Sequence, residues 1–201
     1  MKRIILFPGW PSTKRLLKPL VTELRQNYPV SIYDSKPINT QNVELILISY
    51  SAGVIPLLNF YEQRQRQVTK AVLIAPAGTI NRKLGPHCFS FLSELLVFSR
   101  SNPLKAAWTV LESSANILIK PVKSWKEINE IRKFDLVTRI NTSGIKQKEV
   151  FIINFPQDKF MYNRNTLKKT RIKRFRVPGC HFRFLKDPGE FATAIKNKII
   201  K

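Results

Sequence analysis

Short apolar runs alternate with helical patterns along most of this chain. The runs typical of buried strands lie at Lys2–Phe7, Val30–Tyr33, Leu45–Ile48, Ala71–Ala75, Val150–Asn154 and Ile172–Val177. Apolar residues spaced three or four apart predict helices from Ser12 or Thr13 to about Asn27, from Ala52 to about Gln67, and after Asp187-Pro188. Continuous apolar strands separated by helices predict an α/β fold: a mostly parallel sheet of about six strands with helices on both faces.

The segment between Pro76 and about Ile145 interrupts this alternation. It is too long for a simple crossover, and its pieces HCFSFLSELLVF, NPLKAAWTVLESSANILI and SWKEINEIRKFDLVTRI have helical spacing. We predict a core formed by residues 1–78 and 134–201 and an inserted helical lid over residues 79–133. An ordinary pair of covering helices is the alternative.

A serine stands at the abrupt end of one buried strand, in the stretch LILISYSAGV of residues 45–54. Ser51 has the small residues Ser49 and Gly53 two positions away on either side. A sharp strand-to-helix turn needs small residues there, because the backbone packs against itself. Such a turn also directs the backbone N–H of Ala52 toward the place where an oxyanion would form. The alternative is a serine that merely caps the following helix.

Residues Ser49–Gly53 resemble the Gly-x-Ser-x-Gly elbow of the α/β-hydrolase superfamily, with a serine in place of the first glycine. The superfamily's chain order is serine, acid, histidine. Asp158 follows the apolar run VFIIN by a few residues, and His181 lies in the loop past the last predicted strand. The resemblance therefore implies a catalytic triad of Ser51, Asp158 and His181.

Other acids compete for the role of Asp158. Asp187 is better explained as a helix N-cap, Asp34 follows an earlier strand, and Asp135 lies before the penultimate strand, where some relatives place their acid. The stretch FPGW resembles the superfamily's His-Gly segment, which implies that the backbone N–H of Trp10 is the second oxyanion donor beside Ala52. A plain Pro-Gly turn is the alternative.

The chain also departs from the superfamily pattern. No stretch before FPGW corresponds to the superfamily's two leading strands, so we expect these strands to be absent from the fold. The stretch from Asp34 to Glu44 is barely long enough for a crossover, so we expect its usual helix to be lost. These departures imply a pared-down hydrolase with an exposed sheet edge or an unusually open site.

The resemblance implies a serine hydrolase that cleaves carboxylic esters through an acyl-enzyme, without metal or organic cofactor. An apolar stripe in the lid favours acyl chains, although most of its residues would pack on the core: Phe89, Phe91, Leu92, Leu95, Leu96 and Phe98. The alternatives are a thioesterase or acyltransferase on the same triad, or a non-catalytic hydrolase fold that binds a polyanion.

The net charge of the chain bears on which molecules it could bind. The chain has 201 residues, of which 43% are hydrophobic, and 35 basic against 13 acidic residues give a net charge of +22. Such an excess attracts polyanions, or it reflects only a compositional habit. The basic segment Arg164–Arg176 has almost none of the interleaved aromatic residues that stack on bases, which argues against nucleic acid. A small ester and an anionic membrane surface remain as partner hypotheses.

Cysteine usage and hydropathy suggest a compartment. Two cysteines are too few for a disulfide framework, so we expect no Cys88–Cys180 bridge, and His87-Cys88 and Cys180-His181 lack zinc-site spacing. No apolar run approaches the roughly 18 residues of a membrane span. The apolar part of MKRIILFPGW is too short for a signal peptide. We therefore predict a cytoplasmic protein.

Overall fold

All strands of the fold belong to one parallel sheet. The computed structural model describes residues 1–9, 14–35, 38, 43–78, 84–158, 170–179, 181–182 and 187–200. The sheet has six strands in the order β2-β1-β3-β4-β5-β6, and each neighbouring pair is parallel. The strands are β1 (Lys2–Phe7), β2 (Val30–Ile32), β3 (Glu44–Tyr50), β4 (Val68–Ile74), β5 (Val150–Asn154) and β6 (Lys173–Arg176). The predicted α/β fold is confirmed.

The register places the carboxyl ends of the central strands at one edge of the sheet. Phe7 lies opposite Ser49, Tyr50 lies opposite Ile74, and Ile74 lies opposite Ile153. Residues that directly follow β1, β3, β4 and β5 therefore meet at this edge, which is where parallel sheets place their ligands.

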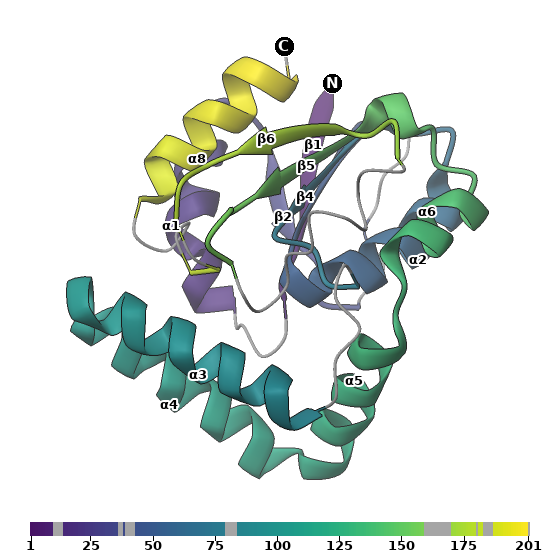
Figure 1. The fold of residues 1–201 in the computed structure, drawn as a ribbon. Helices are drawn as coiled ribbons and strands as arrows, with labels where there is room; N and C mark the ends of the chain where they lie inside the picture. The colour runs from purple at the N-terminus through teal and green to yellow at the C-terminus, as the bar shows by residue number, and fades with distance from the viewer. Residues whose placement is uncertain are drawn as a thin grey trace.

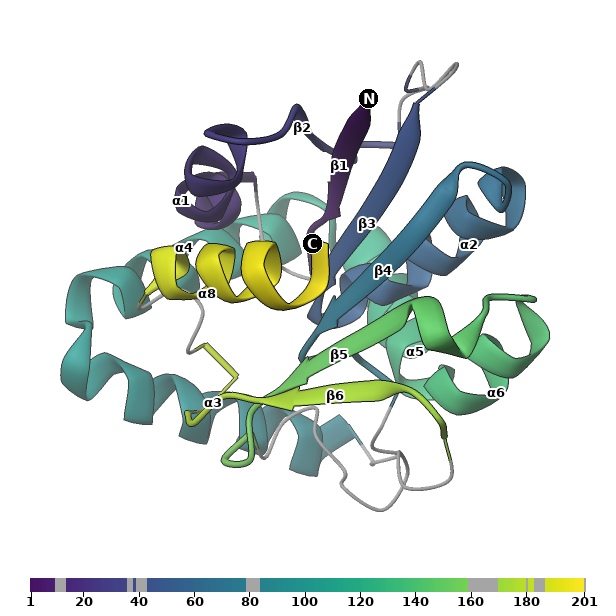
Figure 2. The ribbon, with the colours of Figure 1, turned by 90° about the horizontal axis from the view of Figure 1, so that it is seen from above.

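Helices cover both faces of the sheet, as Figures 1 and 2 show. Helices α1 (Lys14–Arg25) and α8 (Pro188–Ile195) pack together on one face, with a π-helical turn at Lys196–Ile200 after α8. Helices α2 (Val54–Arg64) and α6 (Leu136–Thr142) cover the other face. Alternate strand residues divide between the two cores: Ile4 and Leu6 join the first, and Ile5 and Phe7 join the second.

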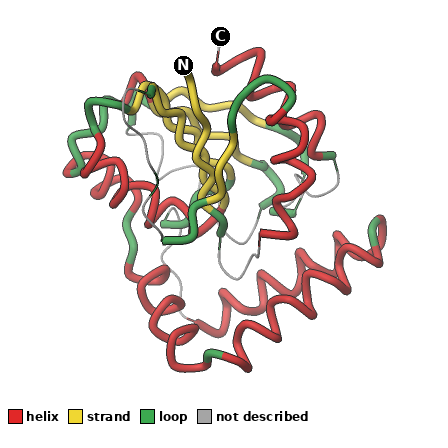
Figure 3. Tube along the Cα trace, turned by 180° about the vertical axis from the view of Figure 1, so that it is seen from behind, coloured by secondary structure: helices red, strands yellow, loops and turns green. Residues whose placement is uncertain are grey.

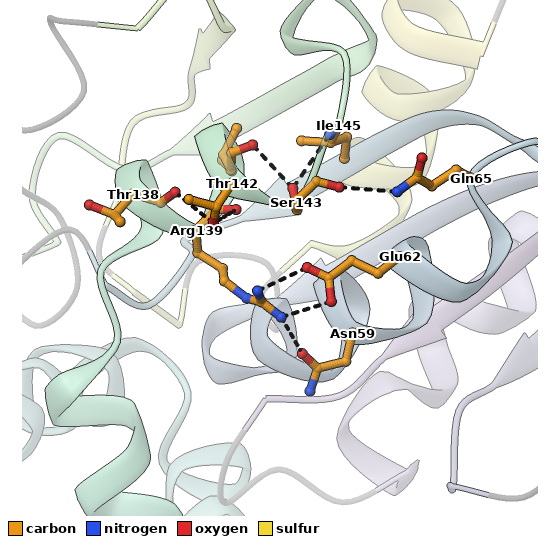
Figure 4. Close-up of polar contacts among 9 residues, drawn as sticks. Asn59, Glu62, Gln65, Thr138, Arg139, Thr142, Ser143 and Ile145 are labelled. Carbon is orange, nitrogen blue, oxygen red and sulfur yellow. Dashed lines mark hydrogen bonds and ion pairs between the residues drawn. The ribbon is translucent and has the colours of Figure 1, made fainter.

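Polar contacts hold α6 against α2 (Figure 4). The guanidinium of Arg139 makes an ion pair with Glu62, in which both N–O distances are 2.9 Å, and it donates to Oδ1 of Asn59 at 3.0 Å. Gln65 donates from its side chain to the backbone oxygen of Ser143. The short helix α6 is thereby fixed to the second core from its outer side as well as through buried Leu136 and Ile140.

Residues 84–133 of the predicted lid are almost entirely helical. They form α3 (Leu84–Ser101), α4 (Pro103–Ile119) and α5 (Pro121–Lys133), which lie beyond the carboxyl ends of the strands (Figure 1). Helices α3 and α4 form an antiparallel hairpin that projects past the sheet (Figure 3). The first residues of the predicted lid, 79–83, lie outside the described residues. No helix in the described part of the chain is long and apolar enough to cross a membrane.

Element ends follow local chemistry. The helix predicted from Ala52 begins instead as a 3₁₀ turn at Ser51–Gly53 and continues as α2, which ends at Arg64. Asp187 is an N-cap as predicted, because its Oδ1 accepts from the N–H of Glu190 at 3.1 Å.

The outer strand β6 is largely exposed. Its three basic residues, Lys173, Arg174 and Arg176, are typical of edges that must not pair with another chain. This gives part of the basic segment an architectural role. The residues of that segment before Thr170 lie outside the described residues.

Candidate active site

Ser51 occupies a strained turn between β3 and the 3₁₀ helix. Its φ is +52°, in the left-handed region that few residues other than glycine adopt. The segment that follows β4 holds this turn, because the N–H of Ala77 donates to the backbone oxygen of Ser51 at 3.1 Å. Strained backbone of this kind persists only where the surroundings fix it, and it concentrates at functional sites.

Small residues around Ser51 allow backbones to pack directly on one another. A Cβ added to Gly53 would overlap the backbone oxygen of Phe7 and lie 2.7 Å from that of Pro8. A Cβ added to Gly9 would lie 2.8 Å from the Cβ of Ser51. Ser49 is fully buried, so its position also requires a small side chain. The end of β1 therefore closes one side of the serine turn.

His181 and Asp158 form a buried pair. Nδ1 of His181 lies 2.8 Å from Oδ2 of Asp158, and the side chains are 2% and 0% exposed. Asp158 is itself placed by a turn after β5, in which its N–H donates to the oxygen of Phe155 at 2.9 Å. A carboxylate at this distance favours the tautomer in which Nδ1 carries the proton and Nε2 offers its lone pair.

Two residues that the sequence analysis missed hold the backbone of His181. Its N–H donates to Oε2 of Glu94 on α3 at 2.6 Å, and its carbonyl accepts from the hydroxyl of Tyr50 at 3.3 Å. The ring of Tyr50 also lies 5.1 Å from the imidazole, measured between centroids. Because Tyr50 directly precedes Ser51, these contacts bring the His181 loop to the end of β3. Glu94 had a signal in the sequence, as a lone acid within the apolar run FLSELLVF.

No hydrogen bond joins the serine to this pair. Within the described part of the chain, Oγ of Ser51 is buried and has no hydrogen-bond partner. Ser51 is 1% exposed and His181 is 2% exposed, so the prediction of an open site is wrong.

The structure describes one of the two proposed oxyanion donors. Ala52 lies in the first turn of the 3₁₀ helix, where backbone N–H groups have no partner within the helix. Trp10 lies outside the described residues.

Two of the three rival acids cap helices. Oδ1 of Asp135 caps α6 by accepting from the N–H of Thr138 at 3.0 Å, and Asp187 caps α8. Among the acids considered, Asp158 is the one on the imidazole. The described residues contain no group of three His, Cys, Asp or Glu that could hold a metal ion.

A cavity of about 460 Å³ opens beside the serine turn. Gly9 and Ala52 line it at the sheet edge, and Lys120, Glu127 and Glu130 line it from the region of α5. The side of this cavity formed by the region of α5 is therefore largely polar.

The predicted apolar stripe of the lid is divided between two environments. Leu95 and Phe98 are buried in the core, whereas Leu92 and Leu96 are exposed. The side chains of Phe89 and Phe91 lie outside the description. The four described residues are absent from the cavity lining.

A comparison with protein-family models finds no match, and a comparison with curated protein sequences finds none. Solved structures do match. The enol-lactonase from Burkholderia xenovorans has a TM-score of 0.74 at 11% identity, with 100% of this chain and 92% of that chain covered. A lipase-esterase related protein from Clostridium acetobutylicum has a TM-score of 0.68 at 15% identity, over 98% and 93% of the two chains.

A membrane phospholipase A, described as a bacterial virulence factor, has a TM-score of 0.68 at 16% identity, over 97% of this chain and 77% of that chain. At these identities the likeness concerns the fold. The chain has the α/β-hydrolase fold, as the elbow sequence and the order of site residues predicted.

Proposed function

We propose that this protein is a serine hydrolase that cleaves carboxylic esters. The observation that carries the proposal is the buried hydrogen bond between His181 and Asp158, held by Tyr50 beside the left-handed turn at Ser51. A structural role alone would explain a buried ion pair or a strained serine. The two together, at the carboxyl edge of a parallel sheet, fit nucleophilic catalysis better.

In the proposed mechanism, Oγ of Ser51 attacks the ester carbonyl while Nε2 of His181 takes its proton. Asp158 keeps the imidazole in the required tautomer and stabilises the imidazolium that forms. The N–H of Ala52 and that of Trp10 bind the oxyanion. His181 then protonates the leaving alcohol, and it later activates the water that releases the acid from Ser51.

The missing hydrogen bond between Ser51 and His181 does not oppose this mechanism. Catalytic hydrogen bonds are often long in substrate-free enzymes and tighten when the substrate binds. The burial of Ser51 does set a condition, because the ester must reach it through a movement of the covering segments. The cavity beside Ala52 extends toward α5, and its lysines and glutamates favour an ester with a polar portion there.

The test is hydrolysis of a p-nitrophenyl ester series of increasing acyl length. Two of the matching structures are those of a lactone-degrading enzyme and an enol-lactonase, so a lactone belongs in the substrate panel together with a thioester. We expect wild-type turnover of esters and only the background rate with Ser51→Ala. A fluorophosphonate should label Ser51 and no other residue.

Retained activity in Ser51→Ala, or labelling of another residue, would exclude the proposed nucleophile. Faster turnover of the thioester than of the matched ester would favour the thioesterase alternative. Steeply salt-dependent binding of a polyanion without any turnover would favour the alternative of a non-catalytic hydrolase fold that binds polyanions.

A further inference from the structure

The outer face of the lid hairpin is apolar and exposed. On α4 the residues at spacings of four and three form one stripe of large side chains, with Leu104 85%, Leu111 61% and Leu118 78% exposed. Trp108 and Ala115 lie in the same stripe and are also exposed. Ala106 and Thr109 are buried, and they lie on the opposite side of the helix.

The two neighbouring helices also have exposed apolar residues. Leu96 on α3 and Trp125 on α5 are more than half exposed, as are Leu92, Val97 and Val122. A helix that is apolar on its inner and outer sides is normally covered on both. We define the docking face as Leu96, Leu104, Trp108, Leu111, Leu118 and Trp125.

Cations flank the docking face at both ends. Arg100 and Lys105 lie at the tip of the hairpin, and Lys120, Lys123 and Lys126 lie where α4 passes into α5; all five are exposed. Between Leu92 and Lys126 the acids are Glu94, which is buried and bonded to His181, and Glu112. The surroundings of the apolar stripe are therefore positively charged.

We infer that the docking face binds the surface of an anionic lipid bilayer. A helix with an apolar outer face and cationic flanks lies in the headgroup region, and half-exposed tryptophans are typical of that depth. Opposite charge attracts the hairpin to the anionic lipid, and the exposed leucines then enter the boundary between the headgroups and the acyl chains. The hairpin lies on the bilayer without crossing it.

Charge also selects the bilayer over a second copy of the chain. Each molecule has a net charge of +22, so two docking faces would approach against strong repulsion. The hairpin projects from the core as a ridge of two helices (Figure 3), a shape that a fluid bilayer accommodates. If the proposed ester hydrolysis also holds, docking brings the lid of the site to a membrane and favours amphiphilic esters as substrates.

The experiment measures co-sedimentation with vesicles, using the Ser51→Ala variant so that binding is separate from turnover. The vesicles are phosphatidylcholine alone, or phosphatidylcholine with a third of it replaced by phosphatidylglycerol. The stripe variant carries Leu111→Glu and Leu118→Glu. The control carries Thr22→Glu and Gln63→Glu, which make the same charge change at exposed positions of α1 and α2.

We expect binding to the anionic vesicles, with the stripe variant weakened roughly tenfold or more and the control little changed. The same stripe substitutions in the chain with Ser51 intact should leave hydrolysis of a soluble ester unchanged, which shows that the fold is retained. Three results would overturn the inference: no vesicle binding, equal binding by the stripe variant and the control, or a dimer in solution that the stripe variant abolishes.

Discussion

At the scale of single residues, the proposed catalysis depends on which acid contacts His181. Asp158 contacts Nδ1 of His181, while Asp135 caps α6. The resemblance favoured Asp158 and left Asp135 as a competitor, and in the structure Asp158 is the acid that contacts the imidazole. The two aspartates therefore make a matched pair for mutation.

Asp158→Asn should lower kcat by about 10⁴ if the residue acts as a triad acid, because an amide cannot hold the imidazole in the required tautomer. Asp135→Asn should change neither kcat nor the melting temperature appreciably, since asparagine caps helices as well as aspartate does. Steady-state kinetics on p-nitrophenyl esters and thermal melts measure both. A damaging Asp135→Asn with a mild Asp158→Asn would transfer the acid's role to Asp135.

Two glycines differ in whether the structure leaves room for a larger side chain. Gly53→Ala should lower the free energy of unfolding by about 1–3 kcal/mol or more, because the new Cβ would meet the backbone of Phe7 and Pro8, which cannot move aside. Gly189→Ala is the control. Its Cβ would lie 3.7 Å from Oδ1 of Asp187, an ordinary contact, in the first turn of α8.

Gly189→Ala should be neutral or stabilise by up to about 1 kcal/mol, because alanine has the higher helix propensity. Urea unfolding of both variants compares them directly. Equal stability of the two variants would mean that the serine turn tolerates a wider backbone spacing than the structure has.

At the scale of elements, α3 is tied to the histidine loop through Glu94. The bond from the His181 N–H to Oε2 is 2.6 Å long, and Glu94 is 3% exposed. A buried N–H that loses its acceptor costs about 1–3 kcal/mol, which the loop can avoid by moving. Glu94 is thus a positioning residue that links the lid to the proposed base.

Glu94→Ala should lower kcat by about tenfold or more with a smaller change in KM, because the histidine shifts while the cavity remains. Glu94→Gln keeps an amide oxygen as acceptor and should recover most of the loss. Michaelis–Menten parameters for wild type and both variants test this. If both substitutions lower the melting temperature equally and leave kcat unchanged, Glu94 serves stability alone.

At the scale of the whole molecule, like charges repel one another in the folded state. Burial lowers the pKa of Lys70, and the nearby Lys2 and Lys173 lower it further. The net charge of +22 extends this repulsion over the surface. Compact folding of such a chain should therefore depend on salt.

The melting temperature should rise by about 2–4 °C between about 0.01 M and 0.15 M NaCl, because the screening length falls from ~30 Å to ~8 Å. This rise corresponds to an increase of roughly 1 kcal/mol in the free energy of unfolding. Differential scanning calorimetry measures it. Lys70→Gln removes the middle charge of three and should reduce the salt dependence. A melting temperature that falls with NaCl would show that attractive ion pairs outweigh the repulsion.

The sequence alone determined the strands, the serine turn and the chain order of the candidate site. Strands such as Val150–Asn154 follow from runs of apolar residues, and the turn at Ser51 follows from the small residues around it. These features depend on residues close together in the chain, so local periodicity and composition are sufficient to predict them.

Only the tertiary structure showed that Asp158 lies within hydrogen-bond distance of His181, that Glu94 and Tyr50 hold the backbone of His181, and which residues of α3 to α5 face outward. The contacts of His181 join residues 23, 87 and 131 positions apart. An apolar helix such as α4 has the same composition whether its outer face is buried or exposed. Long-range packing settles both questions, because it fixes which surfaces meet, and no local pattern in the sequence records that.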